Sequence, residues 1–143
     1  MKNISDLCLL SVFVMLLGFQ RVAVAAELVI NLEDPPATGT VVFALFDSAN
    51  SFGDLRDPVK LVMLPLDGRA EYRIEDVPPG EYALLVYYDE NSNHRIDKNF
   101  IGIPKEPLGF SNSYRPKGPP SYSRAVFDLA DLWRSVIFSS KIE

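Results

Sequence analysis

The stretch AEYRIEDVPPGEYALLVYY, residues 70–88, decides the fold class. In its first half Ala70, Tyr72 and Ile74 alternate with charged residues, which predicts a strand with one face in water. A Pro-Pro-Gly turn then precedes residues 82–88, which are apolar on both faces, as expected for a central strand. Two such strands in succession predict a sheet that packs against a core.

On both sides of this stretch, apolar residues again recur at every second position. Residues 28–32, 41–46 and 59–64 predict three earlier strands, and Asp67-Gly68 predicts a hairpin between residues 59–64 and 70–75. Residues 122–129 predict one or two helical turns, and residues 133–139 a closing strand. About seven short strands in this length predict an all-β fold, a single antiparallel β-sandwich.

Residues 89–120 form a long connection that is rich in Gly and Pro. Its proline and glycine content excludes an ordinary helix, but its apolar content is too high for plain disorder. The apolar residues are Phe100, Ile101, Ile103, Leu108, Phe110 and Tyr114. A connection this long is uncommon without a site, so we expect one long ordered, packed loop.

The charge and the scarce Cys and His exclude several classes of protein. The chain has 143 residues, 14 Lys+Arg against 19 Asp+Glu, a net charge of −5, one Cys and one His. An acidic chain without a basic stripe is not expected to bind nucleic acid. One Cys and one His cannot form a thiolate cluster, a multi-histidine zinc site or a two-cysteine redox motif.

Residues 1–26 have the pattern of a secretory signal peptide. Lys2 precedes an apolar run, residues 7–19, and small residues follow at Ala23, Ala25 and Ala26. The run is shorter than the roughly 20 residues that a membrane anchor, the alternative, requires. We therefore expect cleavage after Ala25 or Ala26, export to the periplasm or the medium, a β-sandwich domain over residues 27–143, and no membrane span after cleavage.

The loop after residue 88 carries the only pattern typical of a chemical site. Oxygen-bearing side chains recur at Asp89, Asn91, Asn93 and Asp97, and the carbonyl of Arg95 would add another oxygen. Calcium takes 6–8 oxygen ligands, and this alternation in a tight loop supplies them. The pattern predicts a calcium site, with a plain polar turn of backbone-bonded Asn and Asp side chains as the alternative.

The loop is not an EF-hand. Position 6 is His94, which would need a left-handed conformation, and position 12 is Phe100 instead of a bidentate Glu. The last ligand would then be Glu106 or water. A catalytic role for His94 is the less favoured interpretation, because a lone His in a polar turn is usually a solvated residue.

Aromatic residues after the loop suggest a second kind of site. Phe110, Tyr114 and Tyr122 could stack on a sugar or another envelope ligand, although aromatic residues near strand ends more often pack in the core.

The run YALLVYYDENSNHRIDKNFIGIPKEPLGFSN (82–112), followed by KGPPSYSRAVF (117–127), resembles the domain-of-unknown-function family 2141 of exported bacterial proteins. Tyr88 stands where the family pattern has His, and His94 where it has Gly. The resemblance implies a prealbumin-like or Ig-like sandwich, and it lends no activity. We therefore expect an exported, non-enzymatic β-sandwich with a calcium-binding loop; the alternative is an envelope ligand- or glycan-binding module.

Overall fold

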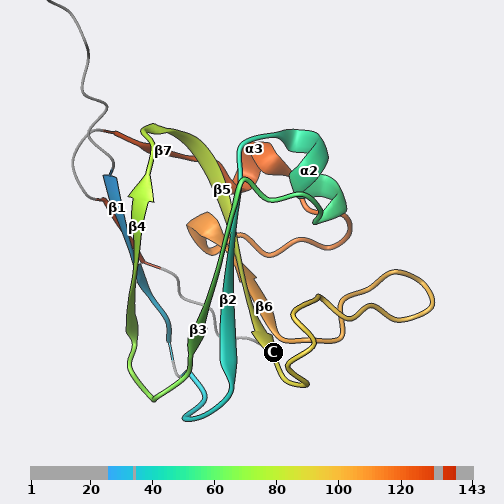
Figure 1. The fold of residues 1–143 in the computed structure, drawn as a ribbon. Helices are drawn as coiled ribbons and strands as arrows, with labels where there is room; N and C mark the ends of the chain where they lie inside the picture. Colours follow the sequence, from blue (N-terminus) through green and yellow to red (C-terminus); the bar gives the residue numbers. More distant parts are fainter. Residues whose placement is uncertain (1–25, 34, 131–133, 138–143) are drawn as a thin grey trace, which may run out of the picture.

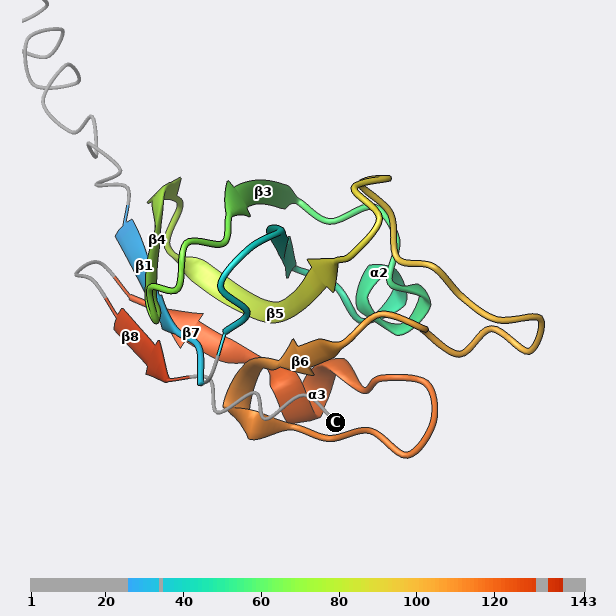
Figure 2. The same cartoon turned by 90° about the horizontal axis from the view of Figure 1, so that it is seen from below.

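The computed structural model describes residues 26–33, 35–130 and 134–137, so the predicted signal peptide lies outside it except for Ala26. One sheet has the strand order β4-β1-β8 (Figures 1 and 2; β8 is labelled in Figure 2). Its strands are β4 (Glu71–Val77), β1 (Ala26–Asn31) and β8 (Arg134–Ile137). β1 runs antiparallel to β4 but parallel to β8. The predicted closing strand is therefore present in its described part.

The second sheet has the order β3-β2-β5-β6, and β7 pairs with the other end of β5. Its strands are β2 (Thr40–Phe46), β3 (Lys60–Pro65), β5 (Gly80–Asp89), β6 (Leu108–Phe110) and β7 (Phe127–Leu129). All pairs in this sheet are antiparallel. The all-β sandwich is confirmed.

The core has two layers because β2 and β5 are buried on both faces. Between the sheets, Phe43 of β2 and Leu84 of β5 pack with Tyr72 and Ile74 of β4. The short helices α2 (Ala49–Asp54) and α3 (Tyr122–Ala125) lie on the opposite face of the larger sheet (Figure 1), where Phe46 belongs to one buried cluster with Phe52 and Ala125. The eight residues Tyr82–Asp89 are all buried, so the predicted central strand is confirmed.

The predicted hairpin at Asp67-Gly68 is wrong. β3 pairs with β2 and β4 pairs with β1, so residues 66–70 cross from one sheet to the other. Leu66 is buried at the crossing and its N–H donates to the Gly39 carbonyl (2.9 Å). Burial of Leu66 between the sheets thus outweighs the local preference of Asp-Gly for a hairpin.

The predicted loop, residues 89–120, is ordered but only partly packed, and it is interrupted by the strand β6. Phe110 of β6 is buried in the core and Leu108 is half-buried against it. The middle of the connection between β5 and β6 protrudes from the domain (Figure 2), and Phe100, Ile101 and Ile103 are exposed. The prediction of a packed loop is therefore wrong for residues 100–103, because the loop carries them away from both core layers.

Candidate functional site

The loop at the end of β5 is organised by Asp89. This residue pairs with Thr40 across the sheet, and only 1% of its surface is exposed. Its Oδ1 accepts a hydrogen bond from the N–H of Asn93 (3.1 Å), and its Oδ2 accepts one from the N–H of His94 (2.8 Å). A single buried carboxylate therefore folds the loop back onto the strand that precedes it.

Two Asn side chains continue the same pattern. Asn91 Oδ1 accepts the N–H of Asn93 (3.1 Å), and Asn93 Oδ1 accepts the N–H of Arg95 (2.8 Å). Ser92 and His94 have positive φ values of 58° and 62°, so the predicted left-handed conformation of His94 is confirmed. These are the bonds that the plain polar turn predicts.

Asp97 closes the loop from its far side. Its Oδ2 accepts from Asn91 Nδ2 (2.6 Å), and its Oδ1 accepts from Asn93 Nδ2 (3.0 Å). The structure thus brings together Asp89, Asn91, Asn93 and Asp97, as the spacing predicts, with the backbone of Arg95 bonded into the same loop.

Glu106 adds a third carboxylate from the other end of the protruding segment. It is 7% exposed, and its Oε2 accepts the N–H of Asp97 (3.3 Å). Its Oε1 is buried and has no hydrogen-bond partner among the described residues. Burial raises the pKa of Glu106, and the nearby charges of Asp89 and Asp97 raise it as well, whereas the backbone N–H groups of Asp97 and Glu90 lower it.

The loop is not a ready-made cluster of charged ligands. Within residues 26–33, 35–130 and 134–137, no three Asp, Glu, His or Cys side chains form a group that could hold a metal ion. The amide nitrogens of Asn91 and Asn93 occupy the carboxylate oxygens of Asp97 instead. A cation at this place would need the two amides to turn their oxygens toward it.

His94 lies at the surface of this loop. Its side chain is 60% exposed, and its Nδ1 is 3.5 Å from Asp89 Oδ2. This geometry suits a solvated loop residue that shields one edge of the buried carboxylate.

The aromatic residues predicted to bind a ligand lie together, but as part of the second core layer. Phe52 of α2 is the centre, with its ring centroid 5.6 Å from that of Phe110 and 6.0 Å from that of Tyr122. The Phe110 ring is 5.9 Å from that of Tyr114. Because Phe110 is 4% exposed and both tyrosines are half-buried, the three rings form no exposed stacking platform.

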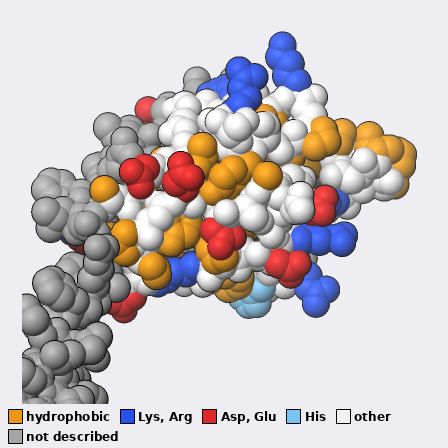
Figure 3. All heavy atoms as spheres, turned by 90° about the horizontal axis from the view of Figure 1, so that it is seen from above, with side chains coloured by type: hydrophobic (Ala, Val, Ile, Leu, Met, Phe, Trp, Pro, Cys, Tyr) orange, Lys and Arg blue, Asp and Glu red, His pale blue; other side chains and the backbone are white. Residues whose placement is uncertain are grey.

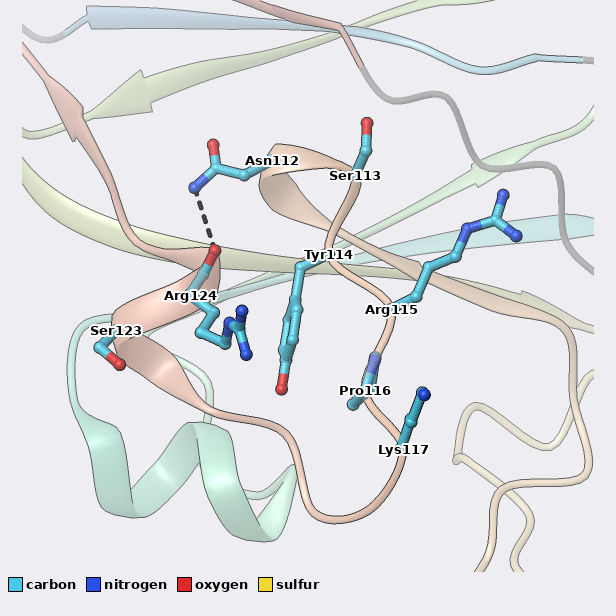
Figure 4. Close-up of a pocket in the computed structure, with 8 residues that line it drawn as sticks. All are labelled: Asn112, Ser113, Tyr114, Arg115, Pro116, Lys117, Ser123 and Arg124. Atoms are coloured by element: carbon cyan, nitrogen blue, oxygen red, sulfur yellow. Dashed lines mark hydrogen bonds between the residues drawn. The ribbon is translucent and has the colours of Figure 1, made fainter.

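The same cluster borders a surface hollow that the sequence did not indicate (Figure 4). Tyr114 stands inside it, with the Arg124 guanidinium 5.9 Å from the ring centroid. The lining residues are Asn112, Ser113, Tyr114, Arg115, Pro116, Lys117, Ser123 and Arg124. Three cations around one hollow are unusual in an acidic chain, but in Figure 4 the Arg115 guanidinium points away from the ring. The separation of Arg124 from the other two in sequence hides this grouping from a reading of the sequence.

Comparison with known proteins identifies a family. A family model described as an uncharacterised protein conserved in bacteria (DUF2141) matches residues 29–136. No curated protein and no solved structure matches the chain. Among the described residues, none of the helices has both the length and the apolar character needed to cross a bilayer.

Proposed function

The chain belongs to the DUF2141 family, and because that description assigns no activity, we propose a function from the chain's own residues. The protein is an exported, non-enzymatic β-sandwich, periplasmic or extracellular, whose loop from Asp89 to Asp97 binds calcium together with Glu106. The ion would fix the entrance of the segment 98–120 and stabilise the folded state, since only that state holds the ligands.

The observation that carries this proposal is the buried carboxylate of Glu106. A plain polar turn accounts for Asp89, Asn91 and Asn93, whose oxygens accept backbone N–H groups. It does not account for Glu106, whose Oε1 is buried without a partner among the described residues. A buried carboxylate oxygen without a donor costs stability, and a bound cation would offset that cost.

The chemistry of the donors suits calcium. Carboxylates would come from Asp89, Asp97 and Glu106. These three do not form a ready group in the structure, so the loop would have to close around the ion as the two amides turn their oxygens inward. Hard cations of this kind prefer oxygen ligands, and calcium tolerates the irregular geometry of a loop better than magnesium does. Water would complete the coordination.

Two further features support the other parts of the proposal. Ala26 begins β1, where it is buried and pairs with Val77, so cleavage after Ala25 would leave the strand whole. The lone Cys8 lies within the expected leader, so the exported domain would contain no disulfide and would gain from an ion that stabilises it.

Isothermal titration calorimetry tests the proposal. We expect the purified exported chain to bind a single calcium ion, Asp97→Ala to abolish the heat, and Glu90→Gln to retain it. Glu90 is an exposed acidic residue within the loop whose side chain is not among the proposed ligands, so it controls for general loss of charge. Circular dichroism would show that Asp97→Ala is folded. Absence of calcium binding to the unchanged protein refutes the site.

A further inference from the structure

The three most exposed large hydrophobic side chains of the described residues lie at the tip of the protruding loop. Phe100 is 98% exposed, Ile101 64% and Ile103 54%. In Figure 3 hydrophobic atoms gather at the end of the molecule from which this loop extends. Single exposed apolar residues are ordinary, but three within four positions on a protrusion mark a surface that binds something apolar.

The backbone of the tip is a closed turn that satisfies much of its own hydrogen bonding. The Asn99 side-chain oxygen accepts the N–H groups of Ile101 (3.1 Å) and Ile103 (2.9 Å). The Asn99 carbonyl accepts from Gly102 (2.9 Å), and the Asn99 N–H donates to Ile103 (2.8 Å). Gly102 makes the turn feasible with a φ of +84°. Because these groups are already paired, moving the tip into an apolar medium costs less.

A lysine lies on each side of the apolar tip, Lys98 before it and Lys105 after it. Lys98 forms a β-bridge with Pro104, and Lys105 donates its N–H to the Asp97 carbonyl (2.8 Å), so exposed lysines lie at the base of both arms. The Lys98 ammonium donates to the Asp54 carbonyl at the end of α2 (3.4 Å), a surface contact that it would exchange for a phosphate. An apolar end above two cations is complementary to a bilayer with anionic headgroups. A convex tip also suits a fluid surface that yields around it, whereas a protein partner would need a matching cavity.

We propose that residues 99–103 insert into the interface of an anionic lipid bilayer, with Lys98 and Lys105 at the level of the phosphates. Phe100 and Ile103 each lie two residues from one of these lysines, which allows a reach of about 7 Å at roughly 3.3 Å per residue. That length matches the depth of about 5–10 Å at which interfacial segments bury their apolar face.

This inference goes beyond calcium binding and does not depend on it. The carboxylates of Asp97 and Glu106 lie at the base of the same hairpin, where they oppose an anionic surface. A bound cation would reduce that repulsion, so we expect calcium to strengthen binding relative to a chelator. Equal binding in the two buffers would count against the linkage to the cation site, whereas the tip variants test insertion.

Vesicle co-sedimentation of the exported chain, with its N-terminus checked by mass spectrometry, tests the proposal. The vesicles contain phosphatidylglycerol and phosphatidylethanolamine, with phosphatidylcholine vesicles for comparison. We expect Phe100→Ser to lower partitioning by about tenfold. Each change of Lys98 or Lys105 to Gln should lower it by about fivefold on the anionic vesicles alone.

The matched control compares two exposed β-branched residues. Ile103 is 54% exposed at the tip, and Val59 is 52% exposed just before β3. Ile103→Ser should weaken vesicle binding and Val59→Ser should leave it unchanged. Absence of vesicle binding, or equal losses in the two variants, overturns the proposal. Since the Phe100 side chain is almost wholly in solvent, its variant should melt like the unchanged protein.

Discussion

Replacing Glu106 by Gln should change stability in opposite directions with and without calcium. In a chelating buffer Glu106→Gln removes a charge that burial and the nearby carboxylates of Asp89 and Asp97 disfavour. We expect the variant to be about 1 kcal/mol more stable there. Calcium at a hundredfold excess over its Kd should stabilise the unchanged protein by about 2.7 kcal/mol. A variant with about a hundredfold weaker affinity would gain only about 0.4 kcal/mol, so the order of stability reverses.

Urea unfolding followed by circular dichroism measures both effects, and pH supplies an independent check. Because the pKa of Glu106 is raised in the folded state, the folded chain holds this proton more tightly than the unfolded chain. Stability in chelator should therefore fall as pH rises from the ordinary glutamate range through the raised pKa, and this fall should be absent in Glu106→Gln. Glu90→Gln should behave like the unchanged protein. The reasoning fails if Glu106→Gln is the less stable protein in chelator, or if calcium stabilises both equally.

Three further changes test other parts of the structure. Ser111→Ala removes a buried hydroxyl that accepts the Leu84 N–H (2.9 Å) and donates to the Ala125 carbonyl (2.5 Å). The variant should lose about 2–3 kcal/mol of unfolding free energy in urea. The control, Ser113→Ala at an exposed position, should lose nearly nothing. Tyr72→Phe removes a buried hydroxyl with no partner among the described residues, so it should raise stability by about 1 kcal/mol, and a loss would contradict this. Burial, together with the nearby carboxylates of Asp89 and Glu106, raises the pKa of Tyr87 to about 12. The folded state therefore holds this proton more tightly than the unfolded state, and stability should fall as pH rises from 10 toward 12. In Tyr87→Phe the urea midpoint should fall less over the same pH range.

The strands were predictable because buried apolar residues alternate with exposed polar residues along the sequence. Exposed Glu71, Arg73 and Glu75 alternate with buried Tyr72 and Ile74 in β4, so the pattern records which face is wet. Periodicity does not record which strand pairs with which. The partner of β4 is β1, about forty residues earlier, and Asp67-Gly68 gives only a local signal that the packing of Leu66 overrides.

The candidate site was predictable in part for a similar reason. Asp89, Asn91, Asn93 and Asp97 lie within one tight loop, so spacing alone brings them together. For the last ligand the sequence left Glu106 and water as alternatives, because Glu106 lies beyond the protruding hairpin. The Lys98–Pro104 bridge and the bond from Lys105 N–H to the Asp97 carbonyl return the chain to the loop, where Glu106 joins the other residues. The helix α2 was missed because its core contact, Phe52, is a single buried residue in a polar stretch without periodicity.

The segment from Phe100 to Glu106 inverts the usual distribution of side chains. Phe100 is 98% exposed, while Glu106 is 7% exposed. Folding stability alone would favour a buried Phe100 ring and an exposed Glu106 carboxylate. An exposed ring loses the free energy of apolar burial, and a buried carboxylate loses its hydration. Local departures of this kind are expected where a protein meets a ligand or a partner. A cation on Glu106 and an apolar phase around Phe100 would each remove one of these costs, and both would act on the same hairpin. This common position would explain how two costly choices persist six positions apart in one hairpin.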